Sequence, residues 1–156
     1  MKNSLGYISF LVFLVLASVT ASFAADDCQP IAASGGAIGW DVLGQTKGKD
    51  QQIDGAWQVV PEFAKGVKAL AGQTIKVRGY MLPLQSREGR SQFVLMATSP
   101  DCATSSKAGA QLWMQIKAST PVQYRREPMV LEGQLELVKS DPDGTFYRLN
   151  SARLVN

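Results

Sequence analysis

The sequence contains no histidine among its 156 residues and only two cysteines, and both shortages exclude kinds of active site. Ser-His-Asp and Cys-His nucleophiles, a histidine general base and histidine-based zinc or copper sites all require an imidazole. The two cysteines lie too far apart in the sequence for a four-cysteine zinc site or a Cys-x-x-Cys redox pair. We therefore expect no enzymatic activity, no catalytic residue, no metal site and no cofactor.

Phosphate-binding glycine loops, nucleophile elbows and EF-hand loops are absent as well. The nearest approach to a carboxylate pair is Glu132 with Glu136, and four residues along a strand separate these groups by about 13 Å, too far for cooperation. Charge is nearly balanced, because removing Lys2 with the leader described below leaves 15 basic against 13 acidic residues, a net charge of +2. This balance argues against nucleic acid or an anionic membrane as a required partner.

One long apolar run lies at the start of the sequence. It follows Lys2, continues from Leu5 to Val19 without a charge, and is too short to span a bilayer comfortably. Ser22 and Ala24 supply the small residues that signal peptidase requires, so residues 1–24 are predicted to be a cleavable signal peptide. An uncleaved anchor is the alternative. We expect a periplasmic protein that has no membrane insertion after cleavage.

Residues 25–56 are predicted to form an irregular N-terminal arm, because glycine, alanine, aspartate, lysine and glutamine dominate its composition. Trp40 and Leu43 are expected to pin this arm to the domain. In an oxidising compartment, a disulfide between Cys28 and Cys102 would stabilise the fold by roughly 4 kcal/mol on the chain-entropy model. A free or reactive thiol at Cys102 is the alternative.

The remainder, residues 57–156, is predicted to be one domain. A short helix is expected over 61–70, where Phe63, Val67 and Leu70 repeat at helical spacing. Five segments in which apolar and polar residues alternate are then expected to be strands. They are 74–81, 92–96, 111–117, 131–137 and 145–155.

Five short strands with a bend at Gly79 predict a mainly β fold, a small five-stranded OB-like barrel with one short helix. A β-sandwich is the runner-up, although five strands are few for one. Methionines at inward strand positions, such as Met81 and Met114, are expected to fill the core rather than to bind copper.

Outward positions of the first and third predicted strands carry cations and aromatic rings. If these strands share one face, the side chains would bind an extended ligand by stacking and charge. The residues are Lys76, Arg78, Tyr80, Trp113, Gln115 and Lys117. A solvated sheet whose aromatics are covered by the N-terminal arm is the competing interpretation. In an exported protein the ligand would be a peptide, a glycan or the edge of a partner protein rather than nucleic acid.

Several short motifs occur in a fixed order along the chain. They are Trp40-Asp41-Val42-Leu43, Leu70-Ala71-Gly72, Gly79-Tyr80-Met81-Leu82-Pro83-Leu84, Phe93-Val94-Leu95, Cys102, Val130 to Gly133 and Tyr147-Arg148-Leu149. In this order they resemble a bacterial family of secreted and lipoprotein domains of unknown function, often encoded beside ABC-transporter genes. The resemblance covers Trp40 to Leu154 and implies a periplasmic accessory or binding role without a catalytic residue. The sequence departs from the family at Cys102-Ala103-Thr104, where members carry Cys-Ile-His.

The predicted function is a periplasmic binding or accessory module of an envelope complex, with a transport complex or another envelope protein as its partner. A small ligand is also compatible with this prediction. The expected binding residues lie at a strand end and in the longest connection, where sites concentrate. They are Tyr80, Met81, Pro83 and Cys102, together with Arg78 and Trp113. The alternatives are a thiol-based redox or metal-handling protein centred on Cys102 and a structural partner that acts by sheet-edge pairing.

Overall fold

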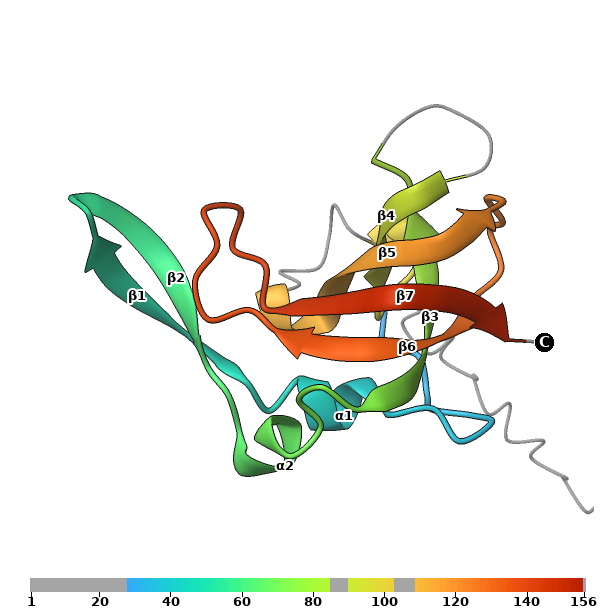
Figure 1. The fold of residues 1–156 in the computed structure, drawn as a ribbon, viewed down its shortest axis with the longest axis horizontal. Coiled ribbons are helices and arrows are strands. Elements are labelled where there is room, and N and C mark those ends of the chain that lie inside the picture. Colours follow the sequence, from blue (N-terminus) through green and yellow to red (C-terminus); the bar gives the residue numbers. More distant parts are fainter. Residues whose placement is uncertain (1–27, 85–89, 103–108, 156) are drawn as a thin grey trace, which may run out of the picture.

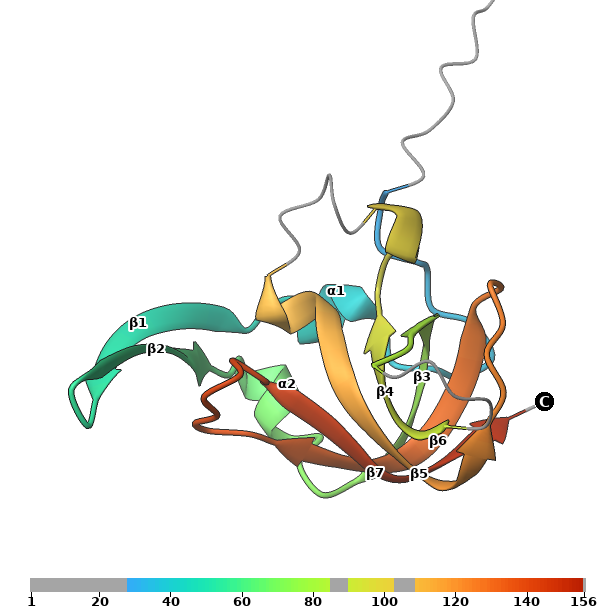
Figure 2. The ribbon, with the colours of Figure 1, turned by 90° about the horizontal axis from the view of Figure 1, so that it is seen from above.

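The computed structural model describes residues 28–84, 90–102 and 109–155, so the predicted signal peptide lies outside the described part. Its main strands are β3 (Thr74–Leu82), β4 (Arg90–Met96), β5 (Trp113–Val122), β6 (Met129–Leu137) and β7 (Tyr147–Val155). They form a closed barrel in the order β3-β4-β5-β7-β6, with β5 and β7 parallel and all other neighbours antiparallel (Figures 1 and 2). The predicted five-stranded barrel is confirmed, and the sandwich alternative is wrong.

Alternation of apolar and polar residues places one side of each strand inside the barrel. In β3, for example, Ile75, Val77 and Met81 are buried, whereas Lys76, Arg78 and Tyr80 face outward. The largest fully buried side chains are Tyr147, Phe93, Phe146, Leu43, Met81, Leu95, Met114, Ile116, Leu131, Leu135, Leu149 and Val67. Met81 and Met114 therefore fill the core, as predicted.

The bend predicted at Gly79 is the point where β3 changes partner. Gly79 pairs with Met129 of β6, whereas the next residue, Tyr80, pairs with Met96 of β4. A Cβ atom at position 79 would lie 2.6 Å from the carbonyl oxygen of Met96. Only glycine lets the two strands approach so closely at this turn of the barrel.

The N-terminal segment contacts the part of the β3 edge that β4 leaves unpaired, because only the last three residues of β3 pair with β4. The amide of Ile31 donates to the carbonyl of Ala97, just after β4, at 2.8 Å. The amide of Ile38 donates to the carbonyl of Lys76 at 2.7 Å, and Ile38 forms a parallel bridge with Val77. We call residues 31–38 the strap, since they cross from β4 to the free edge of β3.

Trp40 and Leu43 pin the N-terminal segment to the barrel, as predicted. They lie in the helical turn α1 (Trp40–Leu43), and their side chains are 2% and 0% exposed. The Trp40 indole N–H donates to the carbonyl oxygen of Arg78 at 2.7 Å. This bond satisfies a β3 carbonyl on the edge away from β6, at a point where β4 does not pair with β3.

The irregular arm predicted up to residue 56 is wrong in its last part, which forms a β-hairpin. Strands β1 (Lys47–Ile53) and β2 (Ala56–Glu62) pair in antiparallel register and project beyond the barrel (Figures 1 and 2). The turn residues Asp54 and Gly55 both adopt positive φ angles, 51° and 81°, as a type I′ hairpin turn requires. Six of the seven β1 residues are exposed, so this strand carries no amphipathic pattern.

The helix predicted over 61–70 is wrong in its N-terminal part. Pro61 and Glu62 end β2, and only the turn α2 (Lys65–Lys68) is helical. The two-stranded hairpin sheet has only edge strands, which tolerate a proline because an outward-facing backbone nitrogen needs no partner. The predicted apolar face remains, since Phe63 and Val67 are buried.

Within the described ranges, no helix is long and apolar enough to cross a bilayer.

Tyr147 connects the N-terminal segment to β7 through a buried hydroxyl group. Its oxygen lies 2.6 Å from the Leu43 carbonyl oxygen and 2.6 Å from Thr46 Oγ1. With one proton available, the phenol donates to the carbonyl and accepts from the threonine hydroxyl. Burial raises the pKa of Tyr147 to about 12 from its ordinary value of 10.0, although the Thr46 hydrogen bond lowers it.

Stability is expected to fall at alkaline pH through Tyr147. Because its pKa is higher in the folded chain, the neutral phenol contributes stability that is complete below pH 10.0 and is lost as the pH rises towards about 12. Denaturant unfolding of wild-type protein and Tyr147→Phe across this range measures the effect. The free-energy difference between them should shrink as the pH rises. Tyr124→Phe is the control, since Tyr124 is 48% exposed, and an unchanged difference for Tyr147→Phe would contradict the assignment.

Candidate ligand-binding groove

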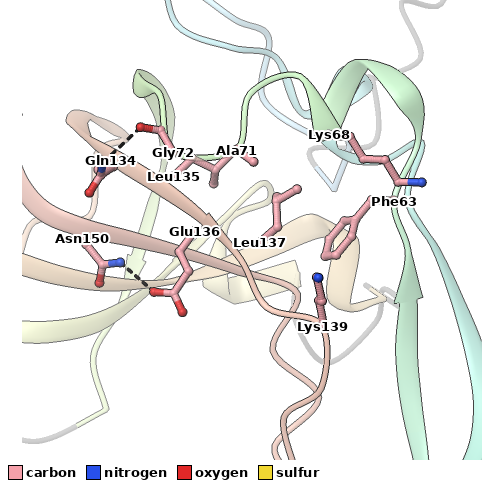
Figure 3. A pocket seen from close by; sticks show the side chains of 10 residues that line it. All are labelled: Phe63, Lys68, Ala71, Gly72, Gln134, Leu135, Glu136, Leu137, Lys139 and Asn150. Carbon is pink, nitrogen blue, oxygen red and sulfur yellow. Dashed lines mark hydrogen bonds between the residues drawn. The ribbon is translucent and has the colours of Figure 1, made fainter.

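Two adjoining cavities form a groove between the barrel and the hairpin. The first has a volume of about 630 Å³ and lies over β6 (Figure 3), and the second, of about 560 Å³, lies against the hairpin. Phe63, Lys68 and Lys139 line both, so the two cavities adjoin at these residues. The first is also lined by Ala71, Gly72, Gln134, Leu135, Glu136, Leu137 and Asn150, and the second by Lys49, Gln51, Ile53, Val60, Pro61, Glu62 and Ser140.

Phe63 forms the apolar centre of the groove. It lies between β2 and α2, is 9% exposed, and its ring centroid is 6.0 Å from that of Tyr147. Lys68 ends α2 and Lys139 follows β6, so elements far apart in the sequence bring both lysines to this ring. Figure 3 shows the two lysines on either side of Phe63.

The groove carries an excess of positive charge. Glu136 pairs with Arg148, whose Nη1 lies 2.8 Å from Glu136 Oε1, and Glu136 also accepts a hydrogen bond of 2.7 Å from Asn150. The same arginine pairs with Asp141, whose Oδ2 lies 3.4 Å from Nη2. In contrast, Lys49, Lys68 and Lys139 form no ion pair with any described residue. Glu62 is the remaining acidic residue among the lining residues. Three lysines that line a groove with an apolar ring suit a ligand that carries negative charge beside an apolar part.

The predicted surface of cations and aromatic rings is assembled only in part. Since β4 lies between β3 and β5, the register aligns Tyr80 with Met96 and Met96 with Trp113 across the outer side of the barrel. Both aromatic residues are half-buried. Lys76 turns towards β6 instead, where its Nζ lies 3.9 Å from Glu132. None of these residues lines the groove.

The other predicted binding residues serve structural contacts. Met81 is 1% exposed and belongs to the core, and Pro83 is half-buried just after β3. Arg78 Nη1 donates to the carbonyl of Ala32 at 3.4 Å. Cys102 is 5% exposed and forms a disulfide with Cys28. The predicted disulfide is confirmed, so the alternative of a free thiol at Cys102 is wrong.

Sequence reasoning missed the groove residues for identifiable reasons. Phe63 was expected only to pack in the core, and the lysines belong to no motif. The one local signal is that Lys139 directly precedes the turn-forming segment 140–144, and loops often carry binding residues. Among the described residues, no cluster of three or more cysteine, aspartate or glutamate side chains has the arrangement of a metal site.

Fold and groove together define a small, disulfide-linked β-barrel with an elongated cationic groove. No family of known proteins matches the sequence, and no curated protein matches it significantly. Among solved structures, the chain is similar to a DUF3299 family protein from Pseudomonas aeruginosa, with a TM-score of 0.43 and 18% sequence identity. This similarity covers 62% of the chain and 68% of the Pseudomonas protein, and it is too distant to assign a function.

Proposed function

We propose that the protein is a periplasmic binding module, an accessory of an envelope complex, whose groove holds an anionic ligand. The observation that carries this proposal is the groove in which Phe63 lies between Lys68 and Lys139, with Lys49 as a further lining residue, and in which these three lysines form no ion pair with a described residue. An apolar concave surface with a few convergent charged groups is the usual form of a ligand site.

The disulfide supports the choice of compartment. Bonds of this kind persist in oxidising environments such as the periplasm and are rare in the cytosol. Cys28 and Cys102 join the start of the described chain to the end of the β4 region. In the envelope, the module would offer its groove to an anionic part of a partner protein or of a transport complex.

Charge reversal in the groove is expected to weaken binding of anionic probes. Calorimetric titration with an acidic hexapeptide and with a galacturonic-acid trimer should show binding of at least one probe, which weakens as ionic strength rises. The double variant Lys68→Glu, Lys139→Glu should bind that probe about tenfold or more weakly, because two attractions become repulsions.

Lys117→Glu provides the matched control, since Lys117 is exposed on β5 and does not line the groove. It changes the total charge of the protein but not that of the site. If Lys117→Glu weakened binding by a similar factor, binding would depend on the net charge of the protein and not on the groove. Absence of binding to both probes at low ionic strength would refute the proposed function.

A further inference from the structure

One wall of the groove is a strand that continues beyond its neighbour. The register of β3 and β6 begins at Thr74 and Gln134. One residue further along β6, the amide of Leu135 donates to the carbonyl of Gln73 at 2.9 Å, and the amide of Gly72 donates to the carbonyl of Leu135 at 2.7 Å. The preceding chain belongs to α2 and its connection, so the edge of β6 that faces away from β7 has no strand beside it after Leu135.

The alternation of backbone hydrogen bonds along β6 shows which edge of the strand the N–H and C=O groups of Leu137 face. The amide of Val138 donates to the carbonyl of Phe146 at 3.0 Å, so Val138 faces β7. Backbone groups of successive strand residues point to opposite edges. Leu137 therefore directs its N–H and C=O away from β7, as Leu135 does, and no described residue bonds to them. Because Leu137 lines the groove, a donor and an acceptor are open to a ligand there.

We infer that the groove binds an extended acidic peptide segment, which pairs through its own backbone with Leu137 of β6. An open strand edge recognises a peptide main chain, because an extended segment offers a donor and an acceptor at the same spacing. Lys68 and Lys139 lie beside this edge and supply charge for aspartate or glutamate side chains, while Phe63 receives an apolar one. This inference rests on the proposed function of the groove and names its ligand class.

Backbone methylation of the peptide tests the pairing directly. The probes are acetylated and amidated hexapeptides that alternate aspartate with an apolar residue, and lysine-containing versions serve as the charge control. Fluorescence anisotropy should show binding of the acidic set alone. Methylation of the one amide nitrogen that bonds to the Leu137 carbonyl should weaken binding about tenfold, while methylation of neighbouring amides that face away should have little effect.

Leu137→Pro removes the corresponding donor from the protein. Although Leu137 is aligned with Tyr147 of β7, its N–H points away from β7, so a proline there breaks no hydrogen bond between β6 and β7. The affinity for the peptide should fall about tenfold. Leu137→Ala keeps the backbone donor and should bind more tightly than Leu137→Pro. The methylated peptides measure the same interaction with the unaltered protein, so a folding defect in Leu137→Pro does not obscure the result.

The outcomes separate this inference from the proposed function. Acidic peptides that bind through Lys68 and Lys139 but tolerate methylation at every amide would refute strand pairing and leave the proposed function, a groove for an anionic ligand, intact. Binding of a galacturonic-acid trimer without binding of any acidic peptide would refute the peptide class alone. Failure of every anionic probe would refute both.

Discussion

Trp40→Ala is expected to lower the free energy of unfolding by about 3–5 kcal/mol. The side chain is 2% exposed, so its removal leaves a cavity at the junction of the N-terminal segment and the barrel. It also removes the donor that the Arg78 carbonyl accepts at 2.7 Å. Denaturant unfolding followed by circular dichroism measures the loss. Trp40→Phe keeps most of the apolar volume without the donor and should lose about 1–3 kcal/mol.

Trp57→Ala is the matched control for this prediction. Trp57 lies on β2 and is 73% exposed, so the same change of residue should alter the free energy of unfolding by about 0.5 kcal/mol or less. Similar losses in the two variants would show that Trp40 is not an anchor of the fold.

Replacement of both cysteines by serine is expected to lower the free energy of unfolding by about 4 kcal/mol. The disulfide joins residues separated by 74 positions, and a cross-link over such a distance restricts the unfolded chain strongly. It also holds the start of the described chain, which precedes the strap, beside the turn that follows β4. Thermal and denaturant unfolding of wild type and of Cys28→Ser, Cys102→Ser measure the effect.

A reducing agent provides the control for the cysteine variant. Reduction of the wild-type protein should lower its stability to that of the double variant, and the same treatment should leave the variant unchanged. Alkylation of both thiols would show that reduction is complete. If the wild-type protein then unfolded at the same denaturant concentration as before reduction, the prediction would be contradicted.

The barrel could be predicted because its strands are buried on one side. In β3 and β6, buried residues alternate with outward ones along most of each strand, which is the pattern that a barrel wall requires. Gly79 could be recognised as a bend, although the reason for it, close approach to the Met96 carbonyl, is visible only in the structure. The alternation of apolar and polar residues therefore predicts which segments form strands, but it does not predict which strands pair with each other.

The hairpin could not be found from periodicity, because its strand β1 is exposed on both faces. Its residues Lys47 to Ile53 contain a single large apolar side chain, so backbone pairing rather than burial defines it. The neglected signal was Asp54-Gly55, a two-residue sequence that favours the type I′ turn. Without the hairpin, Pro61 was assigned to a helix instead of to the end of a strand.

The groove could not be predicted from sequence for a different reason. Lys49, Phe63, Lys68 and Lys139 come from the hairpin, the connection after it, α2 and the end of β6. Their convergence depends on how the hairpin joins the barrel, which no local pattern encodes. The predicted site residues Tyr80 and Trp113, in contrast, do share the outer side of the wall, because strand alternation alone determines that side; the pairing of both strands with β4 then aligns them on either side of Met96.

The strap also determines the order in which this protein can mature. Its partners lie on β3 and after β4, and the disulfide requires Cys102, so the first described residues remain without their contacts until much of the chain has been synthesised. Contacts between distant parts of a chain form slowly, because loop closure must precede them. We therefore expect the disulfide and the contact of Ile31 with Ala97 to form only after the chain has been made as far as residue 102, and the β3 edge beside the strap can be open to other chains until then.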